Sequence, residues 1–209
     1  HGTGPDGVEH VAGDRADVTP LRHRAWDAAI DTSGYDPAHV DASSALDIGH
    51  YVFVSSCNAY PDWPEKPVDE DSPTWQEGEG YGPDKAAAER HVLARGGAVV
   101  RAGLIVGPHD PTDRFTYWPR RLAAGGEVLA PGDPQQPAQI VDVRDLAATL
   151  VRLALDGPGG TFDLTGPQLT LGELLERLRG DSTLVWVDSQ TVLDAGVTPW
   201  TELPLWLPD

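Results

Sequence analysis

The sequence predicts an α/β fold, a doubly wound parallel sheet with a small α+β lobe toward the C-terminal end. The run at residues 51–54 is continuous, apolar and rich in β-forming residues, which is typical of strands covered on both faces. Alanines and charged residues alternate at helical spacing over residues 83–93, and a second buried strand follows at residues 98–101. This order of strand, helix and strand indicates a parallel sheet, because a crossover between parallel strands needs a connecting helix.

Shorter elements are expected before this unit. Residues 8–12 form an apolar-rich run that predicts a strand, residues 28–30 predict a second strand followed by small polar residues, and residues 37–48 are weakly helical. Within the unit itself, between its first strand and its helix, residues 61–80 are dense in proline, acid and tryptophan and predict a long loop. Loops of that length are usually functional.

After Pro108 the pattern changes to that of a smaller lobe. Helices are expected over residues 114–124, 144–155 and 171–179, and strands over residues 127–130, 140–143, 161–164 and 183–187. We therefore expect a core made of residues 1–107 and 140–156, and a substrate-binding lobe made of residues 108–139 and 157–209.

The charge balance argues against several classes of partner. The 209 residues carry 15 basic and 33 acidic side chains, a net charge of −18. A charge of this sign repels a phosphate backbone, so no nucleic-acid partner is expected. No apolar run approaches the roughly 18 residues that a membrane helix needs, so no membrane partner is expected.

Cysteine and histidine usage bears on compartment and metal binding. The single cysteine, Cys57, cannot build a disulfide framework or a thiolate metal site, and we expect a cytoplasmic location. The 7 histidines show no metal-ligand spacing, so no metal is expected.

The best candidate for chemistry is the segment Tyr81-Gly-Pro-Asp-Lys85, at the start of the alanine-rich helix. Positions four apart on a helix share a face, so the Lys85 ammonium is expected near the Tyr81 phenol. An adjacent cation lowers the pKa of a tyrosine from its usual value of about 10 and prepares the phenol for acid/base work near neutral pH. The alternative is a surface tyrosine packed on a lysine stem.

Ser55 and Ser56 directly follow the buried strand at residues 51–54. Ligands of parallel sheets bind at the carboxyl ends of strands, so Ser56 could hydrogen-bond the oxygen on which Tyr81 acts. Two serines after a strand also form turns. A strand-end serine followed downstream by Tyr-x-x-x-Lys resembles the site of the short-chain dehydrogenase/reductase superfamily.

Further segments make the resemblance more specific. The chain is similar to extended members of that superfamily, of the NAD-dependent epimerase/dehydratase type, in the segments Tyr51-Val-Phe-Val-Ser-Ser56, Val100-Arg-Ala-Gly-Leu-Ile-Val-Gly-Pro108 and Ile140-Val-Asp-Val-Arg-Asp-Leu-Ala147. The resemblance implies a Rossmann-like core, NAD or NADP as the cofactor, a small-molecule substrate and a homodimer.

The resemblance also implies roles for single residues. Tyr81 would be the acid/base, Lys85 would lower its pKa and hold the nicotinamide ribose, and Ser56 would polarise the substrate oxygen. The implied cofactor contacts are Asp14 at the adenine, then Arg15, Thr32, Ser33, Gly34 and Ser55, with Gly103 and Val106 behind the nicotinamide. Without the family, Asp14 is equally a turn residue and Gly103 a packing glycine.

Two departures from the family pattern qualify these expectations. Family members begin with a strand, a glycine-rich turn and a helix that holds the pyrophosphate, and we expect that first βαβ unit to be missing here. Residues 2–7 spell G-x-G-x-x-G, but Pro5 lacks a donor and no periodic helix follows, so we interpret them as a loop. Ala138 and Gln139 stand where nucleotide-sugar enzymes commonly place a diphosphate-binding arginine, which argues against a plain nucleotide-sugar epimerase.

The lobe offers three candidates for substrate binding, Arg114, Trp118 and Arg120. The arginines could bind an anion and the tryptophan could wall a pocket, although a solvated helix face and core packing are the alternatives. The expected function is that of an NAD(P)-dependent oxidoreductase or epimerase acting on a secondary alcohol or ketone of a sugar-like small molecule. The alternative is a non-catalytic binding or regulatory protein on a degenerate scaffold of the same superfamily.

Overall fold

The computed structural model describes residues 7–110 and 112–208. Its contacts divide the chain into two compact units, the first made of His1–Ala102 and Ala148–Asp163 and the second of Gly103–Ala147 and Leu164–Asp209. Relative to the division expected from the sequence, residues 103–107 and 140–147 pack with the second unit, and residues 157–163 pack with the first.

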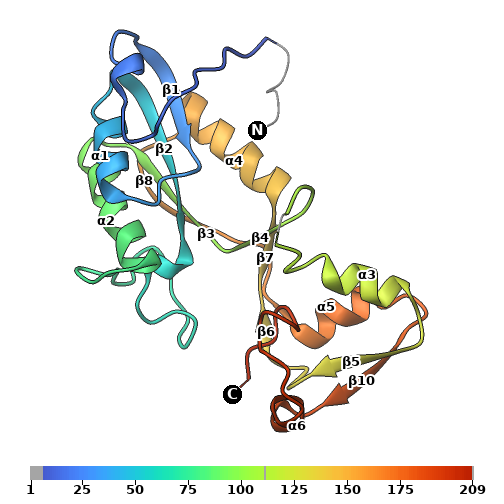
Figure 1. Ribbon diagram of the computed structural model, residues 1–209. Coiled ribbons are helices and arrows are strands. Elements are labelled where there is room, and N and C mark those ends of the chain that lie inside the picture. Colours follow the sequence, from blue (N-terminus) through green and yellow to red (C-terminus); the bar gives the residue numbers. More distant parts are fainter. Residues whose placement is uncertain (1–6, 111, 209) are drawn as a thin grey trace. The chain divides into compact units, whose positions relative to one another are not determined.

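A four-stranded sheet in the order β1-β2-β3-β8 forms the first unit (Figure 1). β1 (Trp26–Asp31), β2 (Ile48–Ser56) and β3 (Ala98–Ala102) pair in parallel, and β8 (Gly160–Leu164) lies beside β3. α1 (Pro37–Ser44) connects β1 to β2, and α2 (Tyr81–Ala94) connects β2 to β3. These are the predicted crossovers, and they confirm the α/β fold class.

Helices cover both faces of this sheet. Figure 1 shows α1 and α2 on one side and the later turns of α4 (Val143–Asp156) on the other. β2 is buried without interruption from Tyr51 to Ser56, as expected of a central strand between two helical layers. One core cluster joins β2, β3, α1 and α2 through Val40, Ile48, Tyr51, Phe53, Ala88, Val92 and Val99.

The second unit is built from three short strand pairs. β4 (Leu104–Val106) pairs in parallel with β7 (Ile140–Asp142), and β5 (Glu127–Pro131) in parallel with β10 (Thr183–Val187). β6 (Pro137–Ala138) pairs antiparallel with β9 (Leu169–Thr170). α3 (Tyr117–Ala123), α5 (Leu171–Leu178) and α6 (Ser189–Asp194) complete this unit. Its core cluster is Trp118, Leu122, Val128, Ala130, Leu171, Leu174, Leu175, Val192, Leu203, Leu205 and Trp206.

Two local differences from the sequence-based expectations concern the predicted first strand and a helix near the C-terminal end. The strand predicted over residues 8–12 is wrong, since this segment is irregular and Val8 and Val11 are 57% and 45% exposed, with no strand paired to them in the described part of the chain. α6 was not predicted; Asp188 caps it by accepting a hydrogen bond from the Thr191 amide. Most of the glycine motif at residues 2–7 lies outside the described residues.

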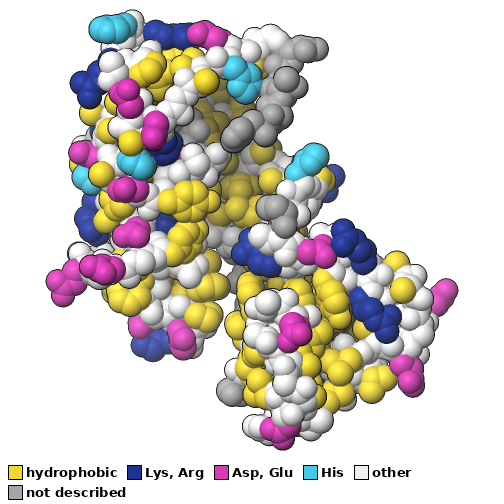
Figure 2. Space-filling model, viewed as in Figure 1, with side chains coloured by type: hydrophobic (Ala, Val, Ile, Leu, Met, Phe, Trp, Pro, Cys, Tyr) yellow, Lys and Arg dark blue, Asp and Glu magenta, His cyan; other side chains and the backbone are white. Residues whose placement is uncertain are grey.

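The visible surface carries both signs of charge. Figure 2 shows Asp and Glu side chains scattered over both units, with Lys and Arg side chains between them. Within the described residues, none of the helices has the length and apolar character that crossing a membrane requires.

Candidate functional site

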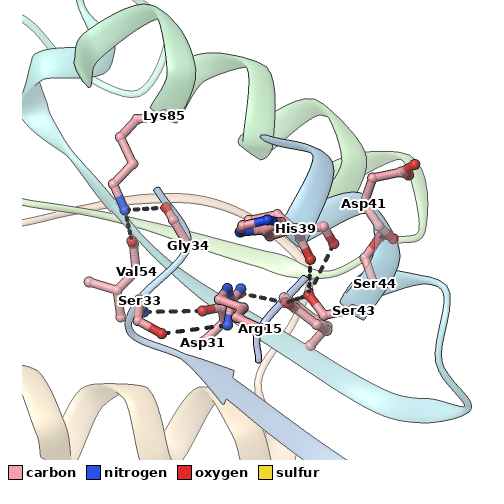
Figure 3. A network of polar contacts seen from close by, with 12 residues as sticks. Arg15, Asp31, Ser33, Gly34, His39, Asp41, Ser43, Ser44, Val54 and Lys85 are labelled. Atoms are coloured by element: carbon pink, nitrogen blue, oxygen red, sulfur yellow. Dashed lines mark hydrogen bonds and ion pairs between the residues drawn. The ribbon is translucent and has the colours of Figure 1, made fainter. Parts of the chain in front are cut away.

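The Lys85 side chain lies between the ends of two neighbouring strands. Lys85 is on α2 and only 3% exposed, and its Nζ donates hydrogen bonds of 2.9 Å to the carbonyl oxygens of Gly34, just after β1, and Val54, in β2 (Figure 3). An ammonium has three donors. These two bonds therefore leave one donor of Lys85 for a ligand.

Aromatic rings surround the same ammonium. The Lys85 Nζ lies 4.7 Å from the ring centroid of Phe53, 5.1 Å from that of Tyr35 and 5.9 Å from that of Tyr81. Burial lowers the pKa of Lys85 from 10.5 to about 8, against the opposing effect of the nearby carboxylates. The ammonium is thus less stable in its charged form than a surface lysine.

Tyr81 opens α2 and remains 49% exposed. The next residue, Gly82, packs so closely against the turn after β2 that a Cβ there would lie 2.3 Å from the Asn58 carbonyl oxygen. The Trp75 indole donates a 3.1 Å hydrogen bond to the same carbonyl. This close approach fixes the start of α2 against that turn, and Tyr81 and Lys85 are brought together as the four-residue spacing predicts.

Ser56 and Ser55 end β2, and both hydroxyls have protein partners. Ser56 caps a short 3-10 helix, η2 (Cys57–Ala59), by accepting a 3.2 Å hydrogen bond from the Asn58 amide, and its hydroxyl also lies 3.1 Å from the Asn58 side-chain oxygen. The Ser55 hydroxyl donates a 2.5 Å hydrogen bond to Glu89 on α2. Ser56 is therefore next to the start of α2, whereas Ser55 points into a buried polar cluster.

That buried cluster joins α2 to β3. Arg101 is 6% exposed and pairs with both carboxylate oxygens of Glu89, at 2.7 Å for its closest contact. Arg101 also donates a 2.7 Å hydrogen bond to the Tyr60 hydroxyl, which in turn donates to Asp163 at 2.8 Å. Desolvation by burial raises the pKa of Asp163. The cluster fixes the strand ends that carry Ser55 and Ser56.

A second polar network lies under the end of β1. The buried carboxylate of Asp31 pairs with Arg15 and accepts a 3.1 Å hydrogen bond from the Ser33 amide (Figure 3). It also accepts a 2.7 Å hydrogen bond from the Tyr51 hydroxyl. Arg15 also reaches the Ser33 hydroxyl at 3.5 Å. The network holds the turn after β1, which carries the Gly34 carbonyl that Lys85 uses.

Among the other predicted cofactor residues of the first unit, two are exposed at the end of β1 and two have structural roles. Thr32 and Ser33 are exposed at the end of β1, whereas Gly34 is buried. A Cβ at Gly34 would lie 2.5 Å from Val40 and 2.6 Å from Phe53, so glycine is needed there for packing. Asp14 accepts a 2.9 Å hydrogen bond from the Ala16 amide, which is the turn role considered from the sequence.

Gly103 and Val106 belong to the second unit. The Gly103 amide donates a 3.0 Å bond to the Leu164 carbonyl, and a Cβ at Gly103 would lie 2.9 Å from the Thr165 hydroxyl. Gly103 is therefore a position of close packing. Val106 is 6% exposed and borders a cavity of about 190 Å³ whose lining includes Arg114.

The three predicted substrate residues differ in environment. Arg114 lines that cavity and a second one of about 290 Å³, which Tyr117 and Trp200 also line. Trp118 is fully buried in the core of the second unit and donates a 2.7 Å hydrogen bond to the Pro204 carbonyl, so the packing alternative describes it better. The exposed Arg120 pairs with Asp113 at 3.0 Å.

Several residues of the site were not singled out from the sequence. They are Asp31, Tyr35, Glu89 and Arg101. Arg101 is a charged residue in an otherwise apolar strand, Asp31 directly follows the apolar run at residues 28–30, and Glu89 follows Lys85 by four positions on α2, so each carried a local signal. The sequence carries no local signal for Tyr35, because its contact with Tyr81 depends on the tertiary fold.

The fold and site define a Rossmann-like α/β protein with a lysine held at the carboxyl ends of its strands. Residues 1–164 match the NAD dependent epimerase/dehydratase family, and the chain belongs to this family. This confirms the resemblance, and it confirms the predicted cofactor class, NAD or NADP, at the level of the family. No protein of curated function matches the chain.

Solved structures show the same fold at low identity. WbmH from Bordetella bronchiseptica, in complex with NAD+, is 19% identical with a TM-score of 0.62, covering 96% of this chain and 82% of its own. The dTDP-glucose 4,6-dehydratase from Bacillus anthracis, in complex with NAD, is 15% identical with a TM-score of 0.64, covering 92% and 76%. RMD from Pseudomonas aeruginosa, complexed with NADPH, is 20% identical with a TM-score of 0.55, covering 73% of this chain and 56% of its own. The chain therefore spans little more than half of RMD.

The residues at the ends of β1 and β2 fit the chemistry of a ribose of a dinucleotide. Lys85 has a donor beyond its two carbonyl bonds, and the exposed Thr32 and Ser33 place two hydroxyls at the end of β1. Ribose hydroxyls are both donors and acceptors, so a cation and hydroxyl groups can bind them together. Within the described residues, no group of three or more His, Cys, Asp or Glu side chains is placed to hold a metal ion.

Proposed function

We propose that this chain is an NAD(P)-dependent oxidoreductase or epimerase that acts on a secondary alcohol or ketone of a sugar-like small molecule. The observation that carries the proposal is the Lys85 ammonium, which donates to the carbonyls of Gly34, after β1, and Val54, in β2, and lies 5.9 Å from the ring of the exposed Tyr81. Family membership supports an enzyme of this broad type.

The proposed division of labour follows from the chemistry of each group. A bound nicotinamide would supply the hydride acceptor or donor. Tyr81 would take the hydroxyl proton of the substrate during oxidation and return it during reduction, next to the Lys85 ammonium. Lys85 would hold the nicotinamide ribose with its remaining donor. Ser56 would hydrogen-bond the substrate oxygen in exchange for its present bond within the Asn58 turn.

The second candidate function is a binding or regulatory protein on the same scaffold. It is favoured by the serine hydroxyls, because both Ser55 and Ser56 are already engaged by protein groups. Such a protein would keep the fold without turning over any alcohol. A measurement of turnover therefore separates the two candidates.

The test is the Tyr81→Phe variant, incubated with NAD+ or NADP+ and a panel of free sugars, sugar acids and sugar nucleotides. Reduced cofactor is followed at 340 nm and conversion of the substrate by liquid chromatography, because an epimerase regenerates its cofactor and gives no net change at 340 nm. We expect the wild-type chain to convert at least one panel member, and Tyr81→Phe to lose about 100-fold or more of that rate, as removal of a general base does. Leu155→Ala, which trims an exposed side chain of α4, is the matched control. Equal rates in Tyr81→Phe and wild type would refute the assignment of Tyr81, and a wild type inert toward the whole panel would favour the binding protein.

A further inference from the structure

The aromatic ring of Tyr35 is an exposed part of the Lys85 site that the proposed roles do not use. Tyr35 is 62% exposed and directly follows Gly34, whose carbonyl accepts a hydrogen bond from Lys85. Its ring centroid lies 6.3 Å from that of Tyr81, with an interplanar angle of 39°. The Lys85 Nζ is nearer to the Tyr35 ring, at 5.1 Å, than to the Tyr81 ring, at 5.9 Å.

The backbone around Tyr35 is fixed on both sides. Gly34 is confined by Val40 and Phe53, which leave no space for a Cβ. On the other side, Asp36 caps α1 by accepting a 2.8 Å hydrogen bond from the Ala38 amide. Tyr35 therefore stands on a rigid support. A large aromatic side chain held in this way gives contact area at a low cost in conformational entropy.

Exposed aromatic rings on rigid positions at the carboxyl end of a parallel sheet are suited to binding flat ligands. The ring of Tyr35 lies next to the cation that we propose to hold the nicotinamide ribose, and the nicotinamide is bonded directly to that ribose. We propose that Tyr35 is a binding residue whose ring stacks on the nicotinamide and orients it toward Tyr81. This inference rests on the proposed function of the Lys85 site.

The experiment compares two ligands that differ in the nicotinamide alone. Isothermal calorimetry measures the dissociation constants of NADH and of ADP-ribose, which lacks the nicotinamide ring, on the full chain. We expect Tyr35→Ala to weaken NADH binding about tenfold, as loss of an aromatic stacking contact does, and to leave ADP-ribose binding unchanged. Tyr35→Phe, which keeps the ring and removes the hydroxyl, is expected to bind NADH like the wild type.

Other outcomes decide against the proposal in distinguishable ways. Equal weakening of both ligands by Tyr35→Ala would show that Tyr35 supports the turn after β1 and does not stack on nicotinamide. Unchanged NADH binding in Tyr35→Ala would overturn the stacking role. A loss in Tyr35→Phe equal to that in Tyr35→Ala would assign the effect to the hydroxyl and overturn the stacking role as well.

Failure of the proposed function itself would have a separate signature. If wild type bound neither NADH nor ADP-ribose, the Lys85 site would not be a dinucleotide site, and both proposals would be wrong. If wild type bound both ligands with the same affinity, and Tyr35→Ala changed neither dissociation constant, only the proposed role of Tyr35 would be wrong. Leu155→Ala serves again as the control for loss of an exposed apolar side chain.

Discussion

Lys85 shows how one buried charge sets the properties of the site. It is removed from solvent, yet its only described hydrogen-bond partners are two backbone carbonyls, so no carboxylate offsets its desolvation by direct contact. Asp31 and Glu89 act on it from a greater distance. As a result, the Lys85 ammonium loses its proton at a lower pH than an ordinary lysine does.

This environment predicts a pH dependence of stability. Burial lowers the folded-state pKa of Lys85 to about 8, against 10.5 for the ordinary group. Between these values the unfolded chain binds more protons at Lys85 than the folded chain does, so the contribution of Lys85 to the free energy of unfolding rises with pH, by about 2–3 kcal/mol across the window.

The measurement is urea denaturation of wild type and Lys85→Met at several values between pH 7.5 and pH 10.5. Lys85→Met lacks this titration, so the stability of wild type relative to the variant should increase as the pH rises. The raised pKa values of Tyr51 and Tyr60 affect both proteins and cancel in the difference. A difference that stayed constant with pH would contradict the account of Lys85.

At the scale of elements, the packing of α2 on β3 depends on a buried ion pair. Glu89 and Arg101 are 2% and 6% exposed, and Arg101 contacts both Glu89 oxygens. Removing one partner of a buried pair leaves an uncompensated charge, which costs about 3–5 kcal/mol, whereas replacing both by apolar residues costs much less.

We therefore expect Arg101→Met to lose more stability than the double variant Glu89→Leu/Arg101→Met. Chemical denaturation of wild type, the single variant and the double variant measures the difference. The account of this pair would be wrong if the double variant were as unstable as the single one. Far-ultraviolet circular dichroism checks that α2 is retained in each protein.

The elements also show where sequence patterns suffice. β2 and α2 were predicted because their patterns are local: β2 is a continuous apolar run, and α2 combines alanines with charges at helical spacing. The four-residue spacing of Tyr81 and Lys85 placed both on α2 before any tertiary contact was known. The strand predicted at residues 8–12 rested on a shorter run that also contains Glu9 and His10, and a strand needs a hydrogen-bonding neighbour, which the described structure does not provide.

Other parts of the site depend on contacts that one sequence does not reveal. Gly34 and Val54 accept hydrogen bonds from Lys85 through their backbone carbonyls, and every residue type has such a carbonyl. The contact of Tyr35 with Tyr81 joins segments 46 positions apart in the numbering. Trp118 illustrates the converse, since an aromatic residue of the lobe was a candidate for substrate binding and is a core residue with its indole donor satisfied.

At the scale of the whole molecule, the two units have separate cores. The core of the second unit includes Trp206, which is fully buried and donates a 3.1 Å hydrogen bond to Ser189. Trp206→Ala should cost about 3–5 kcal/mol in that unit, as large-to-small core substitutions do. Chains with more than one unit often depart from two-state unfolding.

Native-state hydrogen exchange tests whether the units respond separately. In Trp206→Ala we expect amides of β5 and β10 to lose protection, while those of β2 and β3 exchange as in wild type. Equal loss of protection in both sets of strands would contradict the independence of the two cores.

If the proposed function is right, Lys85 is part of a nicotinamide dinucleotide site. The most direct measurement is a fluorescence titration of the full chain with NADH and with NADPH, carried out in parallel on Lys85→Met. The account predicts saturable binding of at least one of the two cofactors by wild type, weakened about tenfold or more in Lys85→Met, because a hydrogen bond from a charged group is worth about 1.5–3 kcal/mol. Wild type without saturable binding of either cofactor, or Lys85→Met with undiminished affinity, would contradict it.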